Sequence, residues 1–268
     1  MRKWWRWLVG AALIVLVLAL GAPYVYIHFI EGPSPSKLTL PSTRSKASAA
    51  SGNTSDVTGV GGTYLVGSGS EAGYRVTEVL LGQNATAVGR TTKIWGSVTI
   101  SGGSVTTGTF TVDMASVESD QSARNAQFDS RIMDVTKYPA ATLKLTAPIA
   151  LGTVPSVGSK ATYTATGDLT MHGVTRNVTF PLTAERTADG IEALADVPIV
   201  FADWGIANPS IGGFVTTDSS GTLEVLVNLT KGAGNPAASG SGSSSVAGGG
   251  GPVTVPKTTV PKITIPAS

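Results

Sequence analysis

The sequence predicts a mainly β fold, an eight-stranded antiparallel barrel with one short helix, preceded by a transmembrane helix. Tyr163–Ala184 alternates apolar and mostly polar positions on both sides of His172-Gly173, which indicates a half-buried antiparallel hairpin with a tight turn. Similar alternating runs recur over residues 63–231, between turns rich in Gly, Ser and Asp. Residues 7–30 carry no formal charge, which is typical of a membrane-spanning helix.

Composition excludes several classes of function. The chain has 268 residues, but both ends have abnormal composition, so one globular domain is expected. Only 13% of residues are charged and the net charge is +2, with no basic cluster beyond the N-terminus. We therefore expect no nucleic-acid partner. Cysteine is absent, which removes disulfides, thiolate metal sites and cysteine nucleophiles together.

The N-terminal residues 1–30 are predicted to be a signal anchor. Arg2, Lys3 and Arg6 precede the uncharged stretch, which is long enough to cross a hydrocarbon core of about 30 Å. The basic side stays cytoplasmic, so we expect a single-pass protein of the cell membrane with an extracytoplasmic domain and residues 7–30 in the cytoplasmic membrane. A cleaved signal peptide is the alternative, since Ala19 and Gly21 offer small residues for cleavage.

Two segments without periodic hydrophobicity flank the domain. Residues 31–62 are rich in Pro, Ser, Thr, Ala and Gly and are predicted to be a flexible linker. Residues 232–268 begin with Gly and Ser and continue with repeats of the type Val-Thr-Val-Pro-Lys, which indicate a disordered, extended tail. This tail is a candidate contact for partners in the cell envelope.

Eight long strands are predicted within residues 63–231, after a short lead at 63–66. Antiparallel strands in this number either close into a barrel or split into a sandwich, and their length favours the barrel. Such a barrel has room for packed side chains or for one small ligand. The predicted strands cover 74–81, 93–100, 105–114, 141–149, the two arms of the hairpin, 191–201 and 222–230.

One segment of the domain breaks the alternation. Over residues 120–134 the apolar residues recur at roughly helical spacing, which predicts a short helix. Lys137-Tyr-Pro139 then ends it, because the residue before proline avoids the helical region. A helix between two barrel strands can cap one mouth, either as a gate or as a structural plug.

Three motifs in this order resemble the YceI-like family of bacterial envelope proteins. They are RIMDVTKYPAATL at 131–143, TGDLTMHGVTRNVTFPL at 166–182 and FADWGIA at 201–207, and the resemblance covers most of residues 64–229. It implies a lipocalin-like, eight-stranded barrel around an apolar cavity that holds a long polyisoprenoid or similar amphiphilic lipid. It also implies export from the cytoplasm, in agreement with the N-terminal segment.

The chain departs from the family pattern at two places. The first long strand, 74–81, lacks the histidine that the family usually carries there, and Asn125 stands where an acidic residue is usual. Contacts with a ligand head group therefore cannot be carried over from the family.

Candidate binding residues follow from the inward faces of the strands and from the helix. Arg124, Arg131 and His172 are head-group candidates, the arginines because guanidinium binds phosphate oxygens bidentately. The alternative for His172 is a turn residue that tolerates positive φ, and the alternative for Trp204 is a plug of the core or rim. The candidates for the cavity wall are Phe110, Val112, Phe128, Met133, Leu143, Leu145, Leu169, Phe180, Phe201 and Trp204.

The sequence favours a binding protein over an enzyme. The domain holds one histidine, no cysteine and no pair of carboxylates at a useful spacing, so we expect neither catalytic residues nor a metal or other cofactor. The first hypothesis is a membrane-anchored lipid-binding protein. The alternative is a structural or interaction protein of the envelope, with its barrel filled by side chains.

Overall fold

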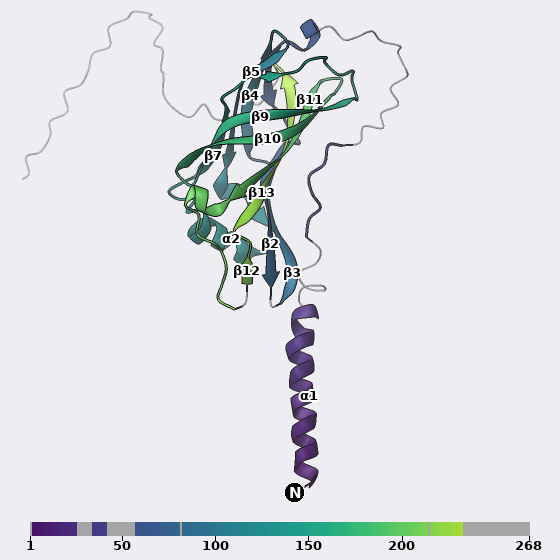
Figure 1. Cartoon of the computed structure of the whole chain (residues 1–268), viewed down its shortest axis with the longest axis vertical. Helices are drawn as coiled ribbons and strands as arrows, with labels where there is room; N and C mark the ends of the chain where they lie inside the picture. Colours follow the sequence, from purple (N-terminus) through teal and green to yellow (C-terminus); the bar gives the residue numbers. More distant parts are fainter. Residues whose placement is uncertain (1, 26–33, 42–56, 81, 214, 233–268) are drawn as a thin grey trace, which may run out of the picture. The chain divides into compact units, whose positions relative to one another are not determined.

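The computed structural model describes residues 2–25, 34–41, 57–80, 82–213 and 215–232 (Figure 1). Apart from residue 232, the predicted tail lies outside these described residues. The same holds for most of the predicted linker.

Eight strands form a closed antiparallel sheet, which confirms the predicted barrel. They follow one another in the order β1-β4-β5-β7-β9-β10-β11-β13, and β13 pairs back onto β1. The closing pairs are Tyr64 with Lys231, Leu65 with Thr230 and Val66 with Leu229. The strands are β1 (Gly62–Val66), β4 (Ile94–Ser101), β5 (Ser104–Asp113), β7 (Ala140–Leu145), β9 (Lys160–Met171), β10 (Val174–Arg186), β11 (Gly190–Val200) and β13 (Ser220–Lys231).

The hairpin formed by β9 and β10 has the predicted turn and register. Met171 pairs with Val174, and the ladder continues without a bulge to Lys160 and Glu185. His172 has φ 50° and Gly173 has φ 76°, the two positive values that a two-residue turn of the favoured type requires. On β9 the residues from Ala165 to Met171 alternate between buried and half-buried positions, so the predicted apolar face points inward.

One strand was missed, and the first predicted strand is present with a partner that was not expected. Residues 74–80 belong to β2 (Glu71–Leu80), which continues β1 along β13 beyond the closing pairs and pairs on its other edge with β3 (Gln83–Thr91). The inward positions of β3 are small residues, which give little hydrophobic signal. Gly89 is one of them, and a Cβ there would overlap the Tyr74 ring. The β2–β3 hairpin extends the barrel wall at one end.

Three short strands complete the sheet. They are β6 (Glu118–Ser119), β8 (Ile149–Ala150) and β12 (Val215–Thr217), which pair with β3, β5 and β2. The predicted strand 141–149 is therefore two separate strands, since β7 ends at Leu145 and β8 begins at Ile149. Pro148 lies between them and has no backbone N–H to donate.

The predicted helix at 120–134 is present as α2 (Ser122–Gln127) and a π-helical turn, η4 (Phe128–Ile132). The Asn125 side chain accepts hydrogen bonds from the Ser119 backbone N–H at 2.8 Å and from the Ser119 hydroxyl at 2.7 Å. This asparagine, unusual for the family pattern, thus ties α2 to β6. The described residues also include three 3₁₀ turns, η2 (Val57–Val60), η3 (Met114–Ser116) and η5 (Phe201–Trp204).

Residues Arg2–Val25 form helix α1. Among the residues that the structure describes, no helix combines the length and the apolar character needed to cross a membrane. The predicted transmembrane helix is therefore without support from the structure, and its last residues, 26–30, lie outside the described part.

A short segment of the predicted linker, Ser34–Pro41, is docked on the outside of the barrel beside β3 (Figure 1). We call it the strap. The Ser34 hydroxyl donates to the Thr86 carbonyl at 2.8 Å, and Leu40 is buried. The expectation of a flexible spacer did not include this docked segment.

The strap lies over an ion cluster on the outer face of β13, β2 and β3. Glu224 is buried and accepts from Arg75 Nε at 2.6 Å and from Arg90 Nη2 at 2.9 Å. Both guanidinium groups also donate to the strap, Arg75 to the Pro35 carbonyl at 2.8 Å and Arg90 to the Ser36 carbonyl. Burial by itself raises the pKa of Glu224, but the hydrogen bonds from the two arginines outweigh it and lower the pKa.

Candidate functional site: an apolar cavity in the barrel

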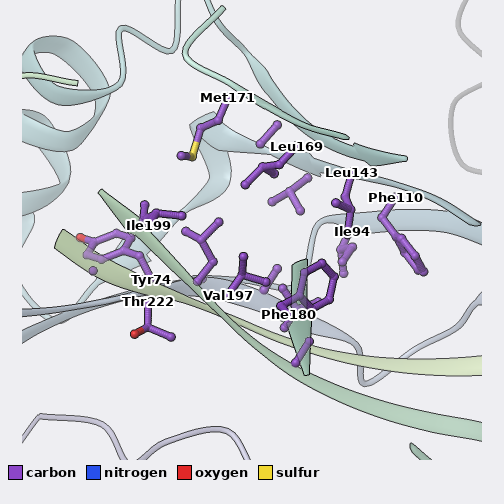
Figure 2. Close-up of a pocket in the computed structure, with 18 of the residues that line it drawn as sticks. Tyr74, Ile94, Phe110, Leu143, Leu169, Met171, Phe180, Val197, Ile199 and Thr222 are labelled. Atoms are coloured by element: carbon purple, nitrogen blue, oxygen red, sulfur yellow. The ribbon is translucent and has the colours of Figure 1, made fainter. Parts of the chain in front are cut away.

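The barrel encloses a cavity of about 600 Å³. Its wall is made almost wholly of apolar side chains, contributed by β2 and by seven of the eight strands of the closed barrel, all except β1. Figure 2 shows part of this wall, with Phe110, Leu143 and Phe180 among its larger side chains and Met171 near its upper edge. A barrel of this strand number can be filled by side chains or hold one small ligand. Here the centre is hollow, which argues against the alternative of a filled barrel.

Small residues explain why the barrel is hollow. The inward positions of β11 include Ala193 and Ala195, and β9 contributes Ala165. Alanine methyl groups leave the centre of the barrel open, although the surrounding wall is almost wholly apolar.

Nine of the ten predicted wall residues line the cavity. Trp204 does not line it, although it is only 2% exposed and belongs to the buried cluster around Phe128 and Leu169. Its indole N–H lies 3.4 Å from the Leu169 carbonyl, so it packs as a plug behind the wall. The nine lining residues are Phe110, Val112, Phe128, Met133, Leu143, Leu145, Leu169, Phe180 and Phe201.

The cavity has a closed end and an open end. At the closed end Val60 from η2 and Val154 line the cavity and are 3% and 7% exposed. At the open end the lining reaches Leu80 of β2, Val215 of β12 and Ile211, which is 46% exposed. In Figure 1 the open end is the one that carries β2, β3, β12 and α2.

Several polar side chains of the wall lie near the open end, on β2 and α2, whereas Arg186 lines the cavity near Val60 at the closed end. Arg124 Nη2 lies 3.1 Å from Glu78 Oε1, and Arg124 Nη1 lies 2.6 Å from Asp120 Oδ1, one helical turn away. Glu78 is itself a buried lining residue. Sequence patterns did not single it out, because its contact with Arg124 joins positions 46 residues apart. The head-group candidate Arg124 thus lines the cavity and is paired with two carboxylates, those of Glu78 and Asp120.

Tyr74 brings a phenol to the same region. Its ring stacks on Phe128 with centroids 5.2 Å apart and planes 12° apart. Burial raises the pKa of Tyr74 to about 12, although the nearby positive charge of Arg124 acts in the opposite direction. The phenol is therefore neutral at physiological pH and can both donate and accept a hydrogen bond.

Arg131, the second head-group candidate, also lines the cavity but lies at the surface. Its Nε donates to Gln127 Oε1 at 2.8 Å, and its Nη2 donates to the Pro209 carbonyl at 2.8 Å. The side chain thereby connects η4 with the loop before β12. This connection holds two sides of the open end together.

The structure places His172 away from the cavity wall. Its Nδ1 lies 3.1 Å from the Trp204 carbonyl oxygen, and its ring packs against Tyr138 with centroids 4.7 Å apart. With its positive φ, the residue shapes the turn, as the alternative interpretation of the sequence expected. Among the described residues, no group of three His, Asp or Glu side chains is placed to hold a metal ion.

Comparisons with known proteins agree with this architecture. A family model described as a YceI-like domain matches residues 64–229, more than half of the chain. A search of curated proteins found no significant match.

Three solved structures illustrate the structural likeness. A polyisoprenoid binding domain from Saccharophagus degradans has a TM-score of 0.52 at 14% identity, covering 64% of this chain and 99% of that one. BcnA from Burkholderia cenocepacia has a TM-score of 0.45 at 23% identity, with coverages of 57% and 94%. The YceI protein of Campylobacter jejuni has a TM-score of 0.39 at 15% identity, with coverages of 52% and 80%. Because the match of the family model spans the whole closed barrel from β1 to β13, the chain belongs to the YceI-like family.

Proposed function

We propose that the barrel binds a polyisoprenoid or a similar amphiphilic lipid, and that the protein acts as a lipid-binding protein without catalytic activity. The observation that carries this proposal is the hollow, largely apolar cavity of about 600 Å³, which has polar side chains at its open end. Burial of an apolar chain there removes its surface from water, worth about 25 cal/mol per Å². The solved relative from Saccharophagus degradans is itself described as a polyisoprenoid binding domain.

The polar end of the cavity suits a small anionic or hydroxylated head group. Arg124 and Arg131 supply guanidinium donors, and Tyr74 supplies a neutral phenol. Glu78 and Asp120 neutralise much of the Arg124 charge. We therefore place the head group beside Arg131, which is exposed at the open end, and the hydrocarbon chain among Leu169, Phe180 and the other wall residues.

We also propose that the protein is exported and held in the cytoplasmic membrane by residues 7–30. The sequence supports this, because that stretch carries no formal charge and Arg2, Lys3 and Arg6 precede it. Within helix α1, Trp7, Leu8 and Val17 are exposed. Extraction of cell membranes at alkaline pH tests the anchor, and we expect the full-length chain to stay in the membrane fraction. Release of the full-length chain into the soluble fraction would contradict the anchor.

The test of lipid binding is a matched pair of substitutions on β11. Ala195→Phe adds a ring to the cavity wall, and Leu194→Phe places the same ring at the preceding residue, which points out of the barrel. Each protein is purified from cells and extracted into organic solvent, and the bound lipid is measured by mass spectrometry. We expect lipid with the natural protein and with Leu194→Phe, and a strong loss with Ala195→Phe.

Two results would overturn the proposal. One is the repeated absence of lipid from the natural protein, together with no binding of an apolar fluorescent probe. The other is an equal lipid content in the two variants, both folded by circular dichroism, which would place the lipid outside the cavity.

A further inference from the structure

The strap fixes where the N-terminal segment leaves the barrel. Ser34 bonds to the carbonyl of Thr86, and the carbonyls of Pro35 and Ser36 accept from Arg75 and Arg90. The donors are themselves held by the buried carboxylate of Glu224, so the strap meets guanidinium groups that are already oriented. Leu40 then buries its side chain at the far end of the strap.

The strap runs away from the open end as the residue numbers increase. On the β2–β3 hairpin, Thr86 pairs with Thr77, whereas Arg90 pairs with Gly73, farther from the turn that joins the strands. Ser34 is therefore the strap residue nearest the β2–β3 turn. That turn follows Leu80, which lines the open end of the cavity. The chain that precedes Ser34 must start from this end of the barrel.

Very little chain separates the strap from the uncharged N-terminal stretch. That stretch ends at Ile30, and only residues 31–33 lie between it and Ser34. An extended chain advances about 3.3–3.6 Å per residue, so the chain between the uncharged stretch and Ser34 can span at most about 14 Å. The predicted flexible linker has 32 residues, but only residues 31–33 determine how far the barrel can lie from the N-terminal segment.

The open end carries apolar side chains on two tips. The first tip is the end of β2 at Leu80, and the second is the loop before β12, where Ile211 and Val215 exchange backbone hydrogen bonds of 2.9 and 3.1 Å. Val215 pairs with Leu80, so the two tips lie side by side. Ile211 is 46% exposed although it belongs to the cavity wall. Leu80, Val215 and Ile211 thus adjoin one another at the rim, and a contiguous apolar patch of this kind is typical of a site that contacts a membrane or another protein.

We propose that the strap turns the open end of the barrel toward the membrane that holds residues 7–30, and that the two tips contact the lipid bilayer. The ligand then passes between bilayer and cavity at this contact without crossing water. The inference rests on the proposed membrane anchor and lipid binding, and adds the orientation of the barrel and the entry site. The surface that the two tips contact is the lipid bilayer, because the chain between the membrane segment and Ser34 is too short to hold the open end far from the membrane.

The experiment uses two cysteine variants of the full chain, which has no natural cysteine. Ile211→Cys marks the open end. Val157→Cys marks the loop before β9 at the closed end, where the exposed fraction is similar, 52% against 46%. Each protein carries an environment-sensitive fluorophore and is reconstituted into phosphatidylcholine vesicles that contain nitroxide-labelled lipid. We expect quenching and a blue-shifted emission at position 211 and neither at position 157.

The strap is tested by replacing residues 34–41 with a Gly/Ser sequence of equal length. The quenching at position 211 should then fall to the level at position 157. Replacement of residues 42–49 by the same sequence is the matched control and should leave the quenching unchanged. Persistent quenching after the strap is replaced would overturn its role.

The result separates this inference from the proposed function, because the bound lipid is measured on the same samples. Equal quenching at the two positions overturns the orientation, even where lipid is bound. Quenching at position 211 alone supports the orientation, even where no lipid is extracted and lipid binding fails. A chain that does not float with the vesicles overturns both the anchor and the orientation. Quenching of position 211 only when another cell protein is added would identify that protein as the occupant and overturn the bilayer contact.

Discussion

A single side chain, Glu224, orients the two arginines that hold the strap on the outside of the barrel. It is 1% exposed, and it is charge-paired with Arg75 and Arg90, which in turn hold the strap. Removing the charge of a buried carboxylate that pairs with two arginines strongly destabilises the folded state, because the two guanidinium charges are then left without a counter-charge.

We predict that Glu224→Gln lowers the free energy of unfolding by about 3 kcal/mol at neutral pH. Urea unfolding measures it. Glu71→Gln is the matched control, since Glu71 is 31% exposed and lies 3.5 Å from Arg90, and it should cost less than about 1 kcal/mol. A loss at Glu224 no larger than that of the control would contradict the prediction.

The difference between the natural protein and Glu224→Gln also depends on pH with a definite sign. The pKa of Glu224 is lowered in the folded state, so the ion cluster contributes fully above the unfolded-state pKa of about 4.3. The contribution is lost as the pH falls through the lower, folded-state pKa. A series of unfolding curves from neutral pH downward should show the two proteins converging in acid, and a constant difference would count against the assignment.

Residue types alone gave an incomplete picture of the site. Phe110, Leu143 and Phe180 were predictable, because alternation fixes the face on which they lie. The tertiary contacts of Trp204 and His172 were not, because each follows a strand end, where the backbone turns and the period of two no longer indicates which residues a side chain meets. Glu78 and Arg124 meet only through folding, since no local pattern relates β2 to α2.

At the scale of elements, the β9–β10 hairpin depends on a turn that only a few residues can form. Gly173 has φ 76°, and a Cβ there would lie 2.5 Å from the Tyr138 ring. Both the backbone conformation and the close ring therefore require glycine.

We predict that Gly173→Ala lowers the free energy of unfolding by more than about 1 kcal/mol, measured by urea unfolding. Gly102→Ala separates the two causes, because Gly102 has φ 57° and no atom lies within 4 Å of its Cβ position. This control should cost less, since it carries the backbone strain without the overlap. Equal losses would show that Tyr138 yields without cost.

Elements with a strong period were predicted well, and those without one were missed. β9, β10 and β11 alternate over ten residues or more, and each has the predicted face inward. β3 was missed because its inward residues are small, and the strap was missed because eight residues without a period resemble a linker. Both acquire their structure from partners elsewhere in the chain.

At the scale of the whole molecule, a hollow barrel should be stabilised by whatever fills it. A ligand that binds only the folded state adds RT ln(1 + [L]/Kd), about 2.7 kcal/mol at a concentration one hundred times Kd. The apolar wall has no other way to bury its surface from water.

We predict that removal of bound lipid by solvent extraction lowers the melting temperature, and that adding the extracted lipid back restores it. Differential scanning calorimetry of the natural protein measures both steps. Ala195→Phe is the control, and its melting temperature should not respond to added lipid, because its cavity is occupied by the new ring. An unchanged melting temperature after complete extraction of the natural protein would contradict the prediction.

The sequence by itself determined the class of fold, the inward faces of the long strands, the turn at His172-Gly173 and the helix near Arg124. These features follow from local chemistry, since the period of two, positive φ and helical spacing are written in neighbouring residues. Only the tertiary structure decided that the barrel is hollow, that one end is open and that the strap docks beside β3. Those features depend on volumes and contacts summed over strands far apart in the chain, and no local pattern records such a sum.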